Sequence, residues 1–147
     1  MSKSPSADAK ATEYRSIPIV ALLSVATLLV GYQIYLCYQW ARELNSLSQG
    51  KRHSPQLVLS LSVLTLGVAA VVYECIFAYE VEGYFRERNR PDALPHFALW
   101  VATLNAIAFL CGITGIGIIV AIPCGVAATC LVQAELNKLA SRVVAEA

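Results

Sequence analysis

The sequence predicts an all-α integral membrane protein, a helical bundle of about four transmembrane helices built around an inverted two-helix repeat. Hydrophobic residues make up 57% of the 147 residues and charged residues only 14%, which is too apolar for an ordinary soluble domain. The apolar residues are gathered in three long stretches without charge, and two of these share short motifs 38 residues apart. These observations favour hydrocarbon over water as the surroundings of the helices.

The first helix is expected over residues 17–40, after a polar N-terminal tail of residues 1–16. No charged residue occurs from Ile17 to Trp40, and about 24 residues are enough to cross ~30 Å of hydrocarbon. A removed signal peptide is the alternative. It is disfavoured because the apolar run exceeds the ~7–15 residues of a signal core and ends in aromatic instead of small residues.

The second helix is expected over residues 56–80, where Ser54-Pro55 is a start signal after the polar connection 42–55. This segment resembles the first one. Ser24-Val25-x-Thr27-Leu28 recurs as Ser62-Val63-x-Thr65-Leu66, and Tyr35 and Cys37 recur as Tyr73 and Cys75. The similarity predicts a duplicated helix packed on its copy, and chance reuse of common membrane residues is the alternative. Consecutive membrane helices run in opposite directions, so we expect an inverted repeat.

The third stretch, Phe97 to Ala134, is too long for one crossing. Three glycines within Gly112–Gly117 predict a turn, because each costs ~1 kcal/mol in a helix relative to Ala. We therefore expect helices over 96–111 and 117–134, with Pro123 kinking the last one or lying near its start. A single kinked segment is the alternative. The transmembrane domain then covers residues 17–137, and 138–147 form a polar tail.

Basic residues indicate the orientation of this four-helix arrangement. With the N-terminus inside, most Lys and Arg residues fall in the two tails and in the loop that contains Arg86, Arg88 and Arg90. Because basic residues accumulate on the cytoplasmic side, both termini are expected in the cytoplasm. The predicted localisation is the inner (plasma) membrane, as a multi-pass protein.

Six polar side chains within the predicted helices are candidates for an intramembrane site: Glu74, Asn105, Ser24, Thr27, Ser62 and Thr65. An ionised carboxylate in hydrocarbon costs several kcal/mol, so Glu74 is the most expensive of them. It lies about one turn from the predicted interface, which favours an interfacial carboxylate or an ion pair with Arg15 or the Arg86 loop over a proton or ion site. We expect Asn105 to form interhelical hydrogen bonds, with a substrate contact as the alternative.

Small residues recur at a spacing of four in the last helix, at Gly117, Ala121, Gly125 and Thr129. They share one stripe and let a neighbouring helix approach closely. Packing within the chain is favoured over oligomerisation.

Residue patterns for catalysis and metal binding are missing from the sequence. The five cysteines fall within or beside apolar segments, where thiols behave as small hydrophobes. Neither His53 nor His96 has a Cys or carboxylate at a ligand spacing. A net charge of +1 gives no attraction to nucleic acid. We therefore expect no catalytic residue, no metal, no cofactor and no nucleic-acid partner.

Two places resemble the bacterial domain-of-unknown-function family 4234, whose members are small polytopic membrane proteins. Its Thr-Leu-Gly-Ile-Tyr hallmark, aromatic helix end and polar exit resemble Thr27-Leu28-Leu29-Val30-Gly31-Tyr32 followed by Tyr38-x-Trp40-Ala41-Arg42-Glu43-Leu44-Asn45. Thr65-Leu66-Gly67-Val68 is a second partial match, and Gln133-Ala134-Glu135-Leu136-Asn137-Lys138 is similar to the way such proteins leave their final helix. The resemblance implies a membrane protein and no particular activity.

The expected role is non-enzymatic: a scaffold, accessory subunit or regulator that works through helix packing, with the lipid bilayer and another membrane protein or further copies of itself as partners. The alternative is a channel or carrier for ions or small solutes. A carrier requires a polar cavity lined by Ser24, Thr27, Ser62, Thr65 or Asn105. A scaffold has these groups bonded within the bundle and no continuous pore.

Overall fold

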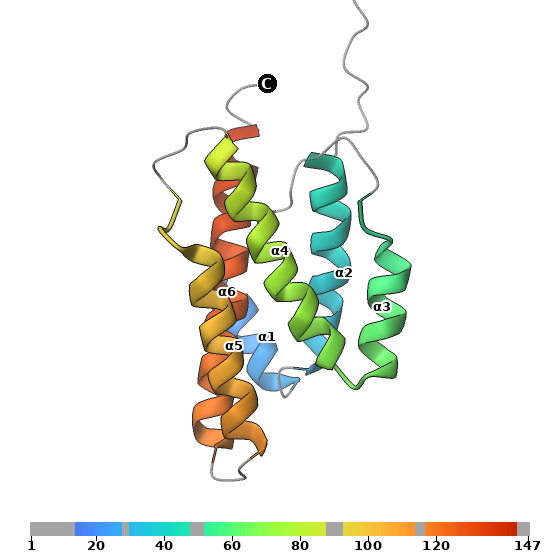
Figure 1. Cartoon of the computed structure of the whole chain (residues 1–147), viewed down its shortest axis with the longest axis vertical. Coiled ribbons are helices and arrows are strands. Elements are labelled where there is room, and N and C mark those ends of the chain that lie inside the picture. Colours follow the sequence, from blue (N-terminus) through green and yellow to red (C-terminus); the bar gives the residue numbers. More distant parts are fainter. Residues whose placement is uncertain (1–13, 28–29, 48–51, 88–92, 114–116, 144–147) are drawn as a thin grey trace, which may run out of the picture.

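The computed structural model describes residues 14–27, 30–47, 52–87, 93–113 and 117–143, and all regular structure within them is α-helical. The helices are α1 (Ile17–Ala26), α2 (Val30–Leu47), α3 (Pro55–Leu64), α4 (Val68–Glu87), α5 (Phe97–Ile113) and α6 (Ile118–Val143). They form three hairpins, α1–α2, α3–α4 and α5–α6 (Figure 1). The all-α class is confirmed.

The predictions of continuous helices over 17–40 and 56–80 are wrong, because each segment is split into a short and a long helix. α1 and α3 both have 10 residues and end at a threonine, Thr27 or Thr65. Each threonine hydroxyl donates to the carbonyl four residues earlier, on Leu23 (2.9 Å) or Leu61 (2.7 Å). Such bonds compete with the helix at its last turn. The repeated Thr-Leu pair therefore marks a helix end.

After α3, Leu66 and Gly67 reverse the chain, with φ values of 50° and 92°. The Gly67 N–H donates to the Ser62 carbonyl (2.8 Å) and the Leu66 N–H to the Val63 carbonyl (3.1 Å), which is the Schellman pattern of a helix end. A Cβ on Gly67 would lie 2.8 Å from Val30 Cγ1. Glycine is therefore required both for the backbone angle and for packing this turn on the start of α2.

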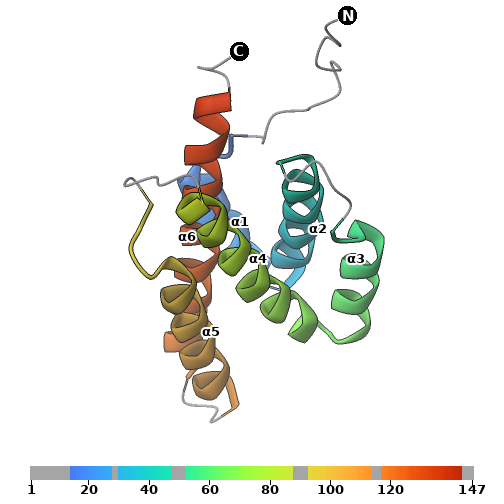
Figure 2. The same ribbon diagram turned by 45° about the horizontal axis from the view of Figure 1, so that its top comes forward.

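The two copies of the repeat have the same fold, but they are not inverted as expected. α1 and α3 run in the same direction, and α2 and α4 both run back towards the opposite end (Figures 1 and 2). The duplicated unit is a whole hairpin and not one membrane helix. An even number of helices returns the chain to its starting end, so the second copy repeats the direction of the first.

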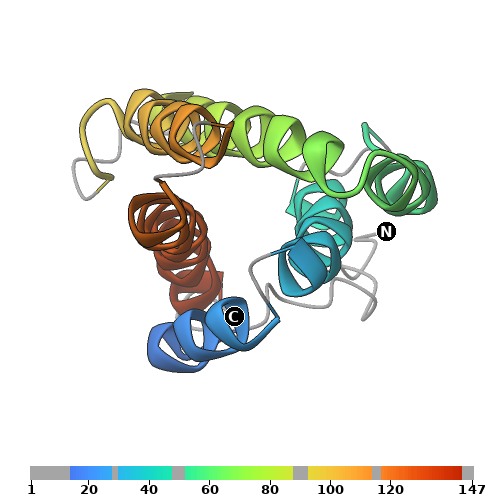
Figure 3. The same cartoon turned by 90° about the horizontal axis from the view of Figure 1, so that it is seen from below.

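Viewed along the helices, the three hairpins form a ring (Figure 3). α1 contacts α2 and α6, α2 contacts α3 and α4, and α4 contacts α5 and α6, so the first and last helices close the ring. The largest apolar side chains buried inside are Leu36, Trp40, Phe77, Phe97 and Leu136. The core therefore includes side chains from α2, α4, α5 and α6.

The α5–α6 hairpin agrees with the helices expected near 96–111 and 117–134. Residues 114–116 of the predicted turn lie outside the described residues. A Cβ on Gly117 would overlap the Cys111 carbonyl, so the end of this turn needs glycine. α6 continues to Val143, past residue 138 where we expected a polar tail to begin. Among the described helices, Ile118–Leu139 is the one segment long and apolar enough to cross a membrane.

Candidate functional site

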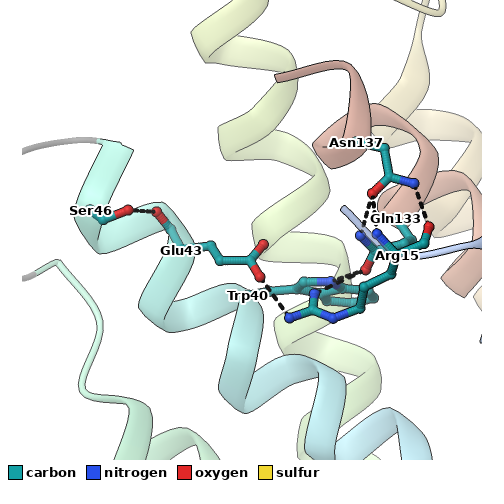
Figure 4. Close-up of polar contacts among 6 residues, drawn as sticks. All are labelled: Arg15, Trp40, Glu43, Ser46, Gln133 and Asn137. Atoms are coloured by element: carbon teal, nitrogen blue, oxygen red, sulfur yellow. Dashed lines mark hydrogen bonds and ion pairs between the residues drawn. The ribbon is translucent and has the colours of Figure 1, made fainter. Parts of the chain in front are cut away.

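The first polar cluster holds the start of α1 against α2 and α6 (Figure 4). The Arg15 N–H donates to Asn137 Oδ1 (3.1 Å), and Asn137 Nδ2 donates back to the Arg15 carbonyl (2.6 Å). The Arg15 guanidinium forms an ion pair with Glu43 (2.8 Å), and only 11% and 9% of these side chains are exposed. Gln133 Oε1 accepts from Trp40 Nε1 (3.0 Å), while Gln133 Nε2 donates to Asn137 Oδ1 (2.9 Å). The Asn137 side chain thus both accepts a hydrogen bond from the backbone of Arg15 and donates one to it. We call such a pair of bonds between an asparagine and the backbone before a helix the helix-start clamp.

A second helix-start clamp lies at the start of α3. The His53 N–H donates to Asn45 Oδ1 (3.0 Å), and Asn45 Nδ2 donates to the His53 carbonyl (2.5 Å). His53 Nε2 also contacts Glu80 Oε1 at 2.8 Å. Asn45 and His53 thus take the places of Asn137 and Arg15, so the repeat extends from backbone geometry to side-chain contacts.

The start of α5 is held in a related way by a carboxylate. The Ala98 N–H donates to Glu82 Oε2 (2.7 Å). Each long helix therefore holds the start of the next hairpin: α2 holds α3, α4 holds α5 and α6 holds α1. This explains why the sequence Glu-Leu-Asn occurs twice, as Glu43-Leu44-Asn45 and Glu135-Leu136-Asn137, since it supplies the asparagine of both clamps.

The second polar cluster surrounds Glu74 in the interior, and we call it the carboxyl cluster. Gln33 Nε2 (2.7 Å) and Asn105 Nδ2 (3.1 Å) both donate to Glu74 Oε2. The Glu74 residue is 0% exposed, and its Oε1 has no hydrogen-bond partner. The Thr129 hydroxyl lies close to the carboxyl group but outside hydrogen-bonding geometry. The carboxyl cluster thus joins α2, α4, α5 and α6.

The prediction that Glu74 is an interfacial carboxylate or part of an ion pair is wrong. Among the described residues, the ion pairs join Arg15 to Glu43, His53 to Glu80, Arg86 to Glu82 and Lys138 to Glu135. None includes Glu74. The reason is the helix face: Glu74 points into the bundle, where amide groups from two other helices bind it, and the Arg15 guanidinium is engaged by Glu43 instead.

A groove of about 850 Å³ lies beside the carboxyl cluster, between α4 and the α5–α6 hairpin. Gln33 and Asn105 reach its wall, and the rest of the lining is largely apolar. The apolar residues include Val30, Val68, Val72, Ile76, Phe109 and Ile122. The groove therefore suits a hydrocarbon chain or an apolar side chain better than a solvated ion.

The four repeated hydroxyl residues do not line this groove. Thr27 and Thr65 bond backbone carbonyls at the ends of α1 and α3. Ser24 and Ser62 are buried, and their hydroxyls have no hydrogen-bond partner. Of the six candidates for an intramembrane site, the structure brings together only Glu74 and Asn105.

The stripe of small residues on α6 faces the rest of the chain. Gly117, Gly125 and Thr129 are buried, and Ala121 is half-buried at the wall of the groove. This is the placement expected for packing within the chain. Thr129 also lies beside Glu74, which its spacing did not indicate.

Sequence reasoning missed Gln33 and Trp40 as members of the two clusters. Gln33 carried a usable signal, because an amide in the middle of an apolar helix needs a buried partner. Trp40 resembled an aromatic residue at a membrane interface, but it is 0% exposed. Within the described residues, no group of three or more His, Cys, Asp or Glu side chains could hold a metal ion.

The fold and these clusters define a small all-α bundle of three hairpins whose polar side chains join helices to one another. Residues 15–74 match the family model described as Domain of unknown function (DUF4234), and this match supports the assignment to that family. The matched segment runs from Arg15 through the first hairpin and α3 into α4, where it ends at Glu74, and the exit sequence at 133–138 lies outside it. No match was found among curated proteins or solved structures.

Proposed function

We propose that this chain is a non-enzymatic integral membrane protein that acts as a scaffold, accessory subunit or regulator through helix packing. The observation that carries this proposal is the use of its polar side chains. Thr27, Thr65 and Asn105 are bonded within the bundle, and the groove beside Asn105 has mainly apolar walls. A channel or carrier needs a continuous polar path instead.

The groove is the place where we expect an apolar helix of a membrane partner to pack. Small side chains at Ala102, Ala106 and Ala121 line it, and small residues let helix backbones approach closely in hydrocarbon. The plasma membrane is the proposed location, and the apolar length of α6 supports it. Four spans with both termini in the cytoplasm are the sequence-based expectation, which the short α1 and α3 do not favour.

The test is isolation of the protein from its own membrane in a gentle detergent, followed by native mass measurement. We expect a complex with one foreign membrane protein at fixed stoichiometry. Ala106→Trp fills the groove and should release that partner, whereas Thr103→Trp, on an exposed position of α5 outside the groove, should not.

The alternative, a channel or small-solute carrier, predicts a different outcome. A pure small oligomer that supports ion or solute flux in proteoliposomes, and loses that flux in Glu74→Gln, would replace our proposal. The buried, unpartnered Glu74 Oε1 is the feature that keeps this second function worth measuring.

A further inference from the structure

We propose that the chain enters a membrane from one face only, with its three hairpin turns in hydrocarbon and all its charged ends in the same aqueous phase. The surface that binds lipid is the apolar end of the bundle, and its ligand is the acyl-chain interior of the bilayer. This inference rests on the proposed membrane location and differs from it in topology.

The distribution of charge is the first argument. Asp, Glu, Lys and Arg are absent from residues 16–41, from 53–73 and from 93–134. Each of these stretches joins the two helices of one hairpin, and the C-terminal ends of α1, α3 and α5 lie at the same end of the bundle (Figure 1). Arg15, Glu43, Glu80 and Lys138 lie towards the other end. Glu74 is the exception, and the carboxyl cluster encloses it completely.

Helix length is the second argument. At 1.5 Å per residue, the 10 residues of α1 or α3 span about 15 Å, half of the ~30 Å hydrocarbon layer. These helices cannot cross a bilayer, but they can reach its middle and turn back. α5 has 17 residues and reaches about 25 Å by the same rise. The short helices of the first two hairpins therefore fit one leaflet, and the third hairpin penetrates deeper.

The exposed side chains at the turns are the third argument. Leu66 is 84% exposed at the α3–α4 turn, and Ile119 is 85% exposed where α6 begins. Leu64 and Ile118 beside them are also largely exposed. Leaving such side chains in water is unfavourable, and backbone groups at a lipid-buried turn must be bonded internally. At the α3–α4 turn, the Schellman bonds satisfy the N–H groups of Leu66 and Gly67.

Exposed aromatic side chains mark the boundary between the two ends. Tyr14 precedes Arg15, Tyr79 precedes Glu80, and Trp100 lies in the first turn of α5. All three are more than half exposed. Tyr and Trp prefer the headgroup region, where an apolar ring and a polar group are both accommodated. Exposed aromatic side chains on three separate parts of the chain are therefore available to lie in the headgroup region.

The test is labelling of single added cysteines in the full-length chain with a membrane-impermeant maleimide, using sealed vesicles of both orientations. The added positions are Arg52→Cys and Arg86→Cys at the charged end, and Leu66→Cys and Ile119→Cys at the turns. Incorporation is measured above that of the parent chain, so the native thiols remain. Helix content and alkaline-carbonate extraction of each variant check folding and membrane integration.

We expect Arg52→Cys and Arg86→Cys to be labelled from the same side only, and both turn positions to be labelled at least tenfold less until detergent is added. Labelling of Arg52→Cys and Arg86→Cys from opposite sides overturns the inference and restores four spans, with the membrane location intact. Labelling of Ile119→Cys from the side opposite to Arg52→Cys also overturns it, because the third hairpin would then cross. Release of the native chain by carbonate, with every position labelled, would refute the membrane location itself.

Discussion

The carboxyl cluster predicts that two substitutions of Glu74 change the stability of the fold in opposite directions. In Glu74→Gln the amide oxygen can accept the same bonds from Gln33 and Asn105, and its NH₂ group can donate towards Thr129. In Glu74→Ala both amide donors lose their acceptor inside the bundle.

The magnitudes follow from these contacts. A charge at the centre of a membrane helix costs roughly 2.5–3.5 kcal/mol. Each of the two bonds weakens by about 1 kcal/mol when its acceptor becomes neutral, so Glu74→Gln should stabilise by about 0.5–1.5 kcal/mol. Glu74→Ala leaves two buried donors unpaired at about 1–3 kcal/mol each, a loss of about 2–6 kcal/mol.

The assay is thermal unfolding in detergent, followed by tryptophan fluorescence and helical circular dichroism. For a chain of this size ~1 kcal/mol moves Tm by roughly 2–4 °C, so Glu74→Ala should lower Tm by about 10 °C. Glu80→Ala is the matched control, since its partly exposed pair with His53 should be worth under about 1 kcal/mol. If Glu74→Gln unfolds as early as Glu74→Ala, the negative charge itself is needed and the cluster is a cation or proton site.

Four further changes test the turns and clamps by the same measurement. Asn137→Ala removes three hydrogen bonds and should cost about 2–3 kcal/mol of stability. Asn45→Ala removes two and should cost less. A larger loss of stability in Asn45→Ala than in Asn137→Ala would contradict this account of the two clamps. Gly67→Ala should cost about 1–3 kcal/mol, since Ala adds a Cβ against Val30 at a positive φ; an unchanged Tm would show that the turn differs from our description. Leu66→Gly should stabilise by roughly 0.5–1 kcal/mol because it relieves a left-handed leucine, and a lower Tm would mean that the exposed side chain is packed.

The sequence was sufficient to predict helices, their approximate extent after residue 96 and the existence of a repeat. It was insufficient at Thr27 and Thr65, because a threonine within an apolar run gives no sign that its hydroxyl will end the helix. Gly67 did carry such a sign, but the length of the apolar run outweighed it. Glu74 was misplaced for a different reason: its nearest positive charges in sequence are far away in space, and the partners that bind it are amides from α2 and α5.

The clamps also affect how the ends of the chain relate to each other. Asn137 near the C-terminus and Arg15 near the N-terminus form the same joint that Asn45 and His53 form within one continuous segment. The contact between α6 and α1 is therefore equivalent to the contact between α2 and α3, except that α6 and α1 are not joined by a loop. A circularly permuted chain, opened between α2 and α3 and joined by a linker from the end of α6 to the start of α1, should close the same ring.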